Sequence, residues 1–239
     1  MNATRLSVNI NKVALIRNAR GGNVPDLVQF AQDCEHYGAQ GITVHPRPDQ
    51  RHIRYDDIPR LRRVVTTEFN IEGRPNDEFM QLVLDNPPHQ CTLVPDAPDV
   101  LTSSEGWNTQ RDADLLREVI GRLQAKNIRV SLFLDPIEEF VEGAKAVGAD
   151  RIELYTGKYA ELYINDPEAA VAPHVGAARL AQQLGLGVNA GHDLNLDNLR
   201  HYRERVPGLL EVSIGQALIS DALYYGIKNT IQMYLARLI

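Results

Sequence analysis

Short apolar segments rich in β-branched residues recur at regular intervals along this chain of 239 residues, and this rhythm restricts the fold more than any other feature. Segments of this kind suit the buried strands of a parallel sheet. Eight of them are found, at 7–10, 41–44, 69–71, 91–94, 130–134, 152–155, 187–190 and 210–214. Stretches with helical spacing separate them, and the one at 25–38 has a proline near its start and a glycine at its end. The chain therefore alternates strand and helix.

Eight strand and helix pairs over this length predict an α/β fold, a (β/α)₈ TIM barrel with extra helices, as one domain over 1–239. An open doubly wound sheet is the alternative. The first strand segment, however, is not followed by the G-x-G-x-x-G turn of a dinucleotide fold. The connection at 157–172 is longer than usual, which predicts an extra helix or a lid there.

Composition limits the partners of the chain. A net charge of -6 and a pI near 5.6 disfavour nucleic acid and anionic membranes as partners. The sequence starts without a signal-peptide pattern and has no run of 18 apolar residues, so we expect a cytoplasmic protein. Cys34 and Cys91 lack C-x-x-C spacing and are expected to be buried core residues.

Polar residues stand where the predicted strands end, and in a TIM barrel the carboxyl ends of the strands form the active site. The set is Asn9, Asn11, His45, Arg47, Glu72, Glu153, Thr156, Asn189, His192, Gly215 and Gln216. A single histidine there is more often a solvated loop residue. Together, His45, His192 and Glu72 supply groups that move protons near neutral pH, which predicts acid/base chemistry.

A local basic cluster, Arg47, Arg51, His52 and Arg54, follows the second strand segment of this acidic chain. Arginine side chains favour phosphate or carboxylate ligands, although Arg51 and Arg54 also fit a solvated loop and Arg20 could instead close a loop. Glycines directly after the last two strands, in N-A-G-H-D and S-I-G-Q-A, let backbone N–H groups approach a phosphate. The segment T-S-S-E-G-W from 102 offers hydroxyls to a second anion.

Other chemistries rank lower. Asn-Ile-Asn stands where metal hydrolase barrels carry His-x-His, and Arg47 beside His45 would repel a cation, so a metal hydrolase ranks lower. No lysine falls within a strand core, which disfavours a mechanism in which an enzyme lysine forms a Schiff base with the substrate. A phosphosugar isomerase or aldolase, and a non-catalytic metabolite sensor, remain as alternatives.

The ordered set of motifs narrows the choice: S-V-N-I-N-K-V-A-L-I-R-N-A-R-G, G-I-T-V-H-P-R-P-D-Q-R-H-I, F-N-I-E-G, S-L-F-L-D, I-E-L-Y-T-G, V-N-A-G-H-D-L and S-I-G-Q-A-L. In this order they resemble the pyridoxine 5′-phosphate synthase family over essentially the whole chain. The resemblance implies a homo-octameric TIM barrel with extra helices. It also implies a condensation of 3-amino-2-oxopropyl phosphate with 1-deoxy-D-xylulose 5-phosphate to pyridoxine 5′-phosphate, phosphate and water, without metal or cofactor.

The same resemblance assigns roles to individual residues. His45 and Glu72 correspond to the acid/base residues, His192 to the proton donor and Glu153 to a charge-stabilising carboxylate. Asn9, Arg20, Asp193, Gly215 and Gln216 would bind the amino-ketone phosphate. Arg47, His52 and Thr102, with Ser103 as a rival for Thr102, would hold the sugar phosphate, and Asn11 would bond a hydroxyl.

Four positions depart from the usual family pattern. Asn11-Lys12 replaces Asp-His, and His45-Pro46-Arg47-Pro48 replaces His-Leu-Arg-Glu, which stiffens the loop. Asp193 replaces a glycine and is expected to point away from a bound phosphate, and Gln216 stands where histidine is common.

Overall fold

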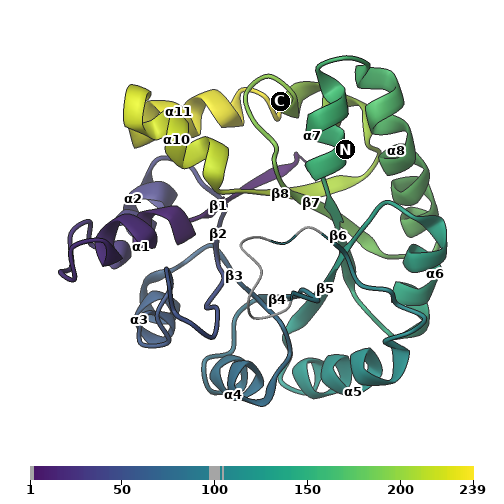
Figure 1. Cartoon of the computed structure of the whole chain (residues 1–239), viewed down its shortest axis with the longest axis horizontal. Coiled ribbons are helices and arrows are strands. Elements are labelled where there is room, and N and C mark those ends of the chain that lie inside the picture. The colour runs from purple at the N-terminus through teal and green to yellow at the C-terminus, as the bar shows by residue number, and fades with distance from the viewer. Residues whose placement is uncertain (1–2, 97–102, 104) are drawn as a thin grey trace.

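The fold is a closed parallel barrel of eight strands in chain order (Figure 1), with β1 paired to β8. The structure is a computed structural model, and it describes residues 3–96, 103 and 105–239. The strands are β1 (Arg5–Asn9), β2 (Gly41–Val44), β3 (Glu68–Gly73), β4 (Gln90–Leu93), β5 (Arg129–Leu134), β6 (Arg151–Tyr155), β7 (Gly187–His192) and β8 (Leu209–Ile214). All eight predicted strands and the TIM barrel are confirmed, and the open sheet is wrong.

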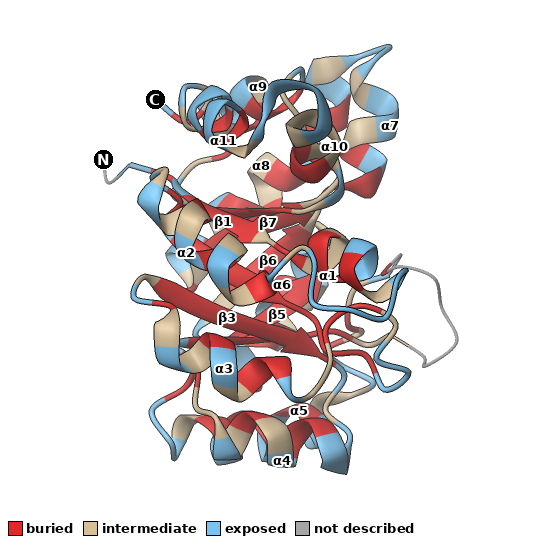
Figure 2. Ribbon diagram, turned by 90° about the vertical axis from the view of Figure 1, so that its left-hand side faces the viewer, coloured by how far each residue is buried: buried red, intermediate tan, exposed pale blue. Residues whose placement is uncertain are grey.

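Helices surround the barrel and turn one face toward it, and their outer faces carry the exposed residues (Figure 2). They are α1 (Asn11–Asn18), α2 (Leu27–His36), α3 (Asp57–Val64), α4 (Asp77–Asp85), α5 (Ala113–Gln124), α6 (Glu138–Ala146), α7 (Gly157–Tyr163), α8 (Pro167–Gln183), α9 (Leu199–Arg205), α10 (Gln216–Tyr225) and α11 (Ile227–Leu235). Extra helices follow β1, β6 and β8. The long connection at 157–172 forms α7 and the start of α8. Of the two predictions for this connection, an extra helix or a lid, the extra helix is confirmed.

Helix α2 shows how the local sequence sets an element's bounds. The Asp26 carboxylate accepts hydrogen bonds from the N–H groups of Val28 and Gln29, so the helix begins after this cap and not at Pro25. Beyond the helix, Gly38 has a φ of +104°, a conformation that glycine adopts readily. The helix predicted within 25–38 is confirmed, and it begins at Leu27, after the Asp26 cap.

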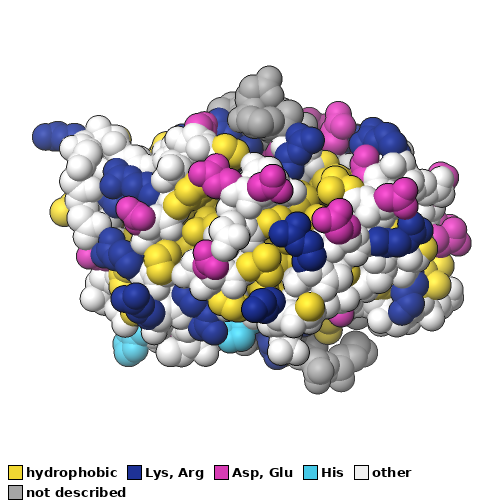
Figure 3. Space-filling view, turned by 90° about the horizontal axis from the view of Figure 1, so that it is seen from below, with side chains coloured by type: hydrophobic (Ala, Val, Ile, Leu, Met, Phe, Trp, Pro, Cys, Tyr) yellow, Lys and Arg dark blue, Asp and Glu magenta, His cyan; other side chains and the backbone are white. Residues whose placement is uncertain are grey.

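Acidic and basic side chains are interspersed on the face of the molecule seen in Figure 3, so that face presents no basic patch. No helix in the described part of the chain is long and apolar enough to cross a membrane. Cys34 and Cys91 are both buried and free, as expected.

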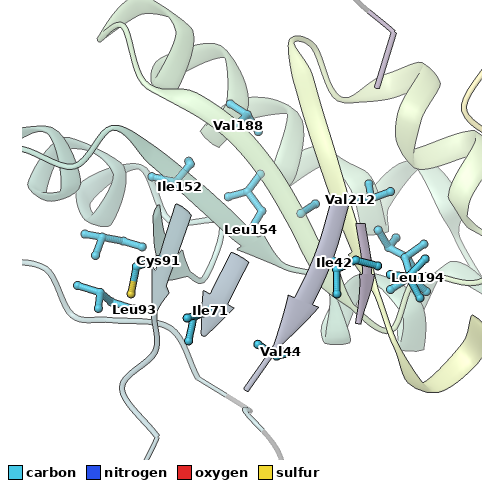
Figure 4. Packing of buried hydrophobic residues seen from close by; sticks show 14 of the residues in the cluster. Ile42, Val44, Ile71, Cys91, Leu93, Ile152, Leu154, Val188, Leu194 and Val212 are labelled. Atoms are coloured by element: carbon cyan, nitrogen blue, oxygen red, sulfur yellow. The ribbon is translucent and has the colours of Figure 1, made fainter. Parts of the chain in front are cut away.

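Residues of the strands alternate between the two sides of the barrel wall along most of their length. Apolar side chains such as Ile42, Ile71 and Leu154 belong to the buried core between barrel and helices (Figure 4). Polar side chains face the barrel interior, where they bond across it: Thr92 of β4 lies 3.5 Å from Glu153 of β6. Because successive residues of a strand point to opposite faces, every second residue lines the interior. The interior of this barrel is therefore polar.

Arginine side chains compensate the charge of Glu68 at the amino-terminal end of the barrel. The buried Glu68 carboxylate accepts a hydrogen bond from Arg129, and its oxygens lie 3.4 Å from Arg5 and 3.8 Å from Arg151. A buried carboxylate without such partners would cost several kcal/mol. These pairs let the strands carry charged residues inside the fold.

A buried ion pair fixes the connection after β2. Arg17 of α1 donates two hydrogen bonds to Asp57 at 2.6 and 2.9 Å, and both side chains are almost fully buried. Arg17 also donates to the backbone oxygen of His52 at 3.1 Å. Helix α1 thus holds the loop that presents His52.

We expect Arg17→Met to lower the free energy of unfolding by about 3–5 kcal/mol, because it leaves the Asp57 charge buried without a partner. Urea denaturation measures this. The control is Arg117→Met, which removes an exposed pair with Asp114 and should change stability by no more than about 0.5 kcal/mol. Equal effects of the two substitutions would contradict the role given to Arg17.

Candidate active site

The carboxyl ends of the strands surround a cavity of about 340 Å³. Eleven of the thirteen residues predicted for the site line it: Asn9, Asn11, His45, Arg47, His52, Glu72, Glu153, His192, Asp193, Gly215 and Gln216. Arg20 is exposed after α1 and is not among the described lining residues. Thr102 lies outside the described residues, whereas its rival Ser103 lines the cavity.

Further lining residues were given no role by the sequence analysis or only a doubtful one: Lys12, Val94, Ser103, Phe133 and Ser213. Phe133 and Ser213 share the inward side of their strands with Ser131 and Glu211. The alternation within the strands could have identified both, because every second residue faces the interior. Asn189, expected at a strand end, instead lies within β7 and bonds Gln90 across the barrel at 3.4 Å.

A chain of hydrogen bonds joins the ends of β1, β2 and β3. The Asn9 amide lies 3.5 Å from the Glu72 carboxylate, and the Asn9 side-chain oxygen accepts from the Asn11 N–H at 3.1 Å. The Asn11 side-chain oxygen in turn accepts from the His45 N–H at 2.9 Å. Asn11 therefore orients the loop that carries His45.

Two buried carboxyl groups face the cavity from opposite sides of the barrel. Burial, then the charges of Glu153 and Asp96, raise the pKa of Glu72 well above its ordinary value. Burial also raises the pKa of Glu153 to about 7, although the Thr92 hydroxyl and His192 act in the other direction. A carboxyl group with a pKa of about 7, as Glu153 has, can both donate and accept protons near neutral pH.

The two histidines after β2 are held in the neutral form. Burial and the neighbouring Arg47 guanidinium lower the pKa of His45 well below its usual range and that of His52 to about 4. The His52 Nδ1 atom accepts a hydrogen bond from the Ile53 N–H at 3.0 Å. Neutral His52 therefore carries its proton on Nε2, which makes it a hydrogen-bond donor and not a cation.

Arg47 has an acidic partner that the sequence analysis missed. Its guanidinium donates to Asp96 at 2.7 Å, and both side chains are 6% exposed. The Ser103 hydroxyl donates to the same Asp96 oxygen at 2.6 Å. One carboxylate oxygen thus occupies a position between an arginine and a hydroxyl, the donor types that bind phosphate.

His192 ends β7 with a φ of +100°, which is unusual for a residue with a side chain. Such backbone costs about 1–3 kcal/mol and persists where the surroundings hold it. Its Nδ1 atom lies 2.7 Å from the Asp193 carboxylate, and its ring contacts Tyr155 edge-on at 5.1 Å between centroids. This bond lowers the pKa of Asp193. The Asp193 carboxylate thus faces His192, and Asp193 is part of the cavity lining.

Two helices begin at the cavity. Asn11 and Lys12 open α1, and Gln216 opens α10 directly after Gly215. The first N–H groups of a helix lack intrahelical partners and favour anions. A Cβ atom on Gly215 would lie 3.2 Å from Asn9, so glycine permits this close packing.

The fold and this site define a class: barrel enzymes that transfer protons on small anionic substrates. Within the described ranges, no three His, Cys, Asp or Glu side chains gather as a metal site would require. Comparison with known proteins identifies the family. The model of the family described as "Pyridoxal phosphate biosynthesis protein PdxJ" matches residues 6–239, and the chain belongs to this family.

Relatives agree with this assignment. The chain is 57% identical to the pyridoxine 5′-phosphate synthase of Flavobacterium johnsoniae, over 98% of this chain and 99% of the relative. It is 58% identical to that of Bacteroides fragilis, over 97% of this chain and 98% of the relative.

Among solved structures, a thiamine phosphate pyrophosphorylase from Pyrococcus furiosus superposes with a TM-score of 0.62 at 12% identity, covering 99% of this chain and 95% of that one. A phosphoribosylanthranilate isomerase from Thermotoga maritima superposes with a TM-score of 0.61 at 13% identity, covering 98% of this chain and 98% of that one. These two show the fold alone.

We expect the raised pKa of Glu153 to make stability depend on pH. Between about pH 4.5 and pH 7 the folded protein holds a proton that the unfolded chain has lost, so stability falls as pH rises through this window. Glu153→Gln cannot titrate. Its free energy of unfolding should therefore rise relative to wild type by about 3 kcal/mol across the window and stay level above it.

Urea denaturation at a series of pH values measures this difference. Glu118→Gln, at an exposed position of α5, is the control and should follow wild type throughout. A constant difference between Glu153→Gln and wild type at all pH values would contradict the assignment.

Proposed function

We propose that this chain is a pyridoxine 5′-phosphate synthase that condenses 3-amino-2-oxopropyl phosphate with 1-deoxy-D-xylulose 5-phosphate. The products are pyridoxine 5′-phosphate, inorganic phosphate and water. The observation that carries the proposal is the convergence of His45, Glu72, Glu153 and His192 on one cavity in a chain of this family. Metal and organic cofactors have no part in it.

The proposed site for the sugar phosphate lies beside β2 and β4. Arg47 and His52 would donate to its oxygens, with Thr102 or Ser103 as the hydroxyl donor. Support comes from Asp96, whose carboxylate oxygen already lies between Arg47 and Ser103. An oxygen of the sugar phosphate would replace this Asp96 oxygen, because a guanidinium group binds phosphate with the same paired N–H groups that bind carboxylate.

The amino-ketone phosphate would bind across the barrel mouth, at the start of α10. Backbone groups at Asp193, Gly215 and Gln216 would donate to it, and Asn9 would contact it from β1. The free N–H groups of a helix start support this assignment. Arg20, which the family pattern places here, is exposed and away from the lining, so its contribution is the least supported.

Two phosphate sites in one cavity hold the reactants side by side, which removes much of the entropic cost of their encounter. The amine of one substrate would condense with the ketone of the other, with loss of water. His192 would donate a proton at the amino-ketone carbonyl. His45, neutral at physiological pH, would move protons on the sugar oxygens.

Glu72 would remove protons from carbon or water during phosphate loss and ring closure. Its raised pKa makes its carboxylate a stronger base than an ordinary one. Glu153, beside His192, would stabilise positive charge that develops during the condensation. Loss of water then yields the aromatic ring, whose stability drives the final step.

The proposal also makes the chain a cytoplasmic homo-octamer. Exposed apolar side chains on α7 and α10 support assembly: Leu162 and Ile164 are 54% and 84% exposed, and Leu223 and Tyr224 are 73% and 86% exposed. Surfaces of this kind often mark contacts between subunits. Sedimentation of the purified chain as a monomer would refute the octamer, and cell fractionation tests the location.

A coupled assay tests the function. Purified protein is given both phosphorylated substrates, and pyridoxine 5′-phosphate fluorescence and inorganic phosphate are followed in parallel. Equal appearance of both products, dependent on both substrates, is expected. An isomerised or cleaved sugar without pyridine would favour a phosphosugar isomerase or aldolase, and binding without turnover would favour a sensor.

We expect Glu72→Gln to reduce kcat by at least about 100-fold while substrate dissociation constants change little, because the amide keeps the shape and loses the proton-transfer group. Single-turnover kinetics and calorimetric titration separate the two quantities. Glu78→Gln, an exposed first-turn position of α4, is the control. Loss of binding in Glu72→Gln would instead give Glu72 a structural role.

A further inference from the structure

The orientation of His192 does not follow from its place in the strand. Asn189 of β7 faces the barrel interior, where it bonds Gln90, and a Cβ atom on Gly191 would lie 2.3 Å from the Glu153 carboxylate, which also faces inward. Val188 and Ala190 belong to the core outside the barrel. Alternation therefore assigns His192 to the outer side, toward the helices. It lines the cavity instead, and its φ of +100° accounts for the turn.

The peptide group before His192 is held by one residue. Thr156 donates two hydrogen bonds to the Gly191 carbonyl oxygen, from its N–H at 3.1 Å and from its hydroxyl at 2.7 Å. Thr156 is completely buried and occupies the N-cap position of α7. A threonine there usually bonds the helix's own N–H groups, yet this hydroxyl makes no such bond. Its hydrogen bond is directed to β7.

The backbone one residue beyond His192 is held as well, at the carbonyl group of Asp193. The Asn198 side-chain amide donates to the Asp193 carbonyl oxygen at 3.2 Å, and the Tyr159 hydroxyl donates to the Asn198 carbonyl oxygen at 2.7 Å. Tyr159 belongs to α7, the extra helix that Thr156 begins. Helix α7 thus supports the peptide group before His192 directly and the Asp193 carbonyl indirectly, through Asn198.

The geometry points to Thr156 as a positioning residue for His192, and we propose that its hydroxyl holds the Gly191 carbonyl so that the imidazole stays turned into the cavity. Asn198 completes the support from the other side. Without the hydroxyl, the backbone at His192 relaxes toward the ordinary strand conformation and the imidazole leaves its catalytic position. The inference deepens the proposed function, because it supposes that His192 is the proton donor.

Three substitutions test it. Thr156→Val removes the hydroxyl and keeps the shape and the backbone N–H, whereas Thr156→Ser keeps the hydroxyl. Thr109→Val is the matched control, since Thr109 is equally buried and its hydroxyl donates to the Phe140 carbonyl oxygen at 2.9 Å, away from the cavity. If Thr156→Val does not fold, Thr156→Ala takes its place.

We expect Thr156→Val to lower kcat about tenfold with KM nearly unchanged, because a displaced proton donor loses catalysis before binding. Thr156→Ser should keep most of the activity, and Thr109→Val should lose stability without this loss of kcat. In a His192→Gln background, Thr156→Val should have little further effect on kcat. A fall in kcat no larger than that of Thr109→Val, or an undiminished effect in the His192→Gln background, would overturn the inference.

Nuclear magnetic resonance of the imidazole nitrogens tests the same point without turnover. The His192 signals, assigned by their loss in His192→Gln, should move in Thr156→Val and remain in place in Thr156→Ser and Thr109→Val. Unmoved signals in Thr156→Val would overturn the inference even if the enzyme makes pyridoxine 5′-phosphate. If wild type makes no pyridoxine 5′-phosphate, the proposed function fails, and these signals still decide whether Thr156 positions His192.

Discussion

The structure depends on the hydrogen-bonded pairing of β1 with β8. Leu6 to Val8 pair with Val212 to Ile214 in parallel register, which closes the sheet into a ring. Because all eight strands are parallel, closure brings their carboxyl ends to one rim. Asn9, from the start of the chain, thereby packs against Gly215, from near its end. An open sheet would leave these two strands at opposite edges and would divide the site.

Closure has a second consequence, since it encloses a polar interior. At the amino-terminal end of the barrel Glu68 is paired with arginines, whereas burial outweighs the nearby positive charges for Glu72 and Glu153 at the carboxyl ends of the strands. Burial there raises the pKa of Glu72 and Glu153 and lowers that of His45. The same desolvation that would weaken an ordinary core therefore favours the neutral forms of these groups, and it raises the pKa of Glu153 to about 7.

Much of the fold was predictable because it follows local patterns. Every strand lies where a β-branched segment stands, and the Asp26 cap explains the small shift at the start of α2. Most of the site was predictable for the same reason, since its residues follow strands in a barrel. The partner of Arg47 was not, because Asp96 is distant in sequence and no pattern links the two. The inward alternation that reveals Phe133 and Ser213 was present in the sequence and was not used.

The sequence by itself determined the barrel, through the spacing of its strands, and most of the residues at its mouth, through their position at the strand ends. The tertiary structure alone decided how these residues behave. His192 lines the cavity against the alternation of its own strand, where Thr156 and Asn198, from other elements, bond the carbonyl groups of Gly191 and Asp193. The pKa values of Glu72 and Glu153 likewise depend on burial by groups far apart in the chain. Orientation and charge are set by such non-local contacts, which a sequence pattern does not encode.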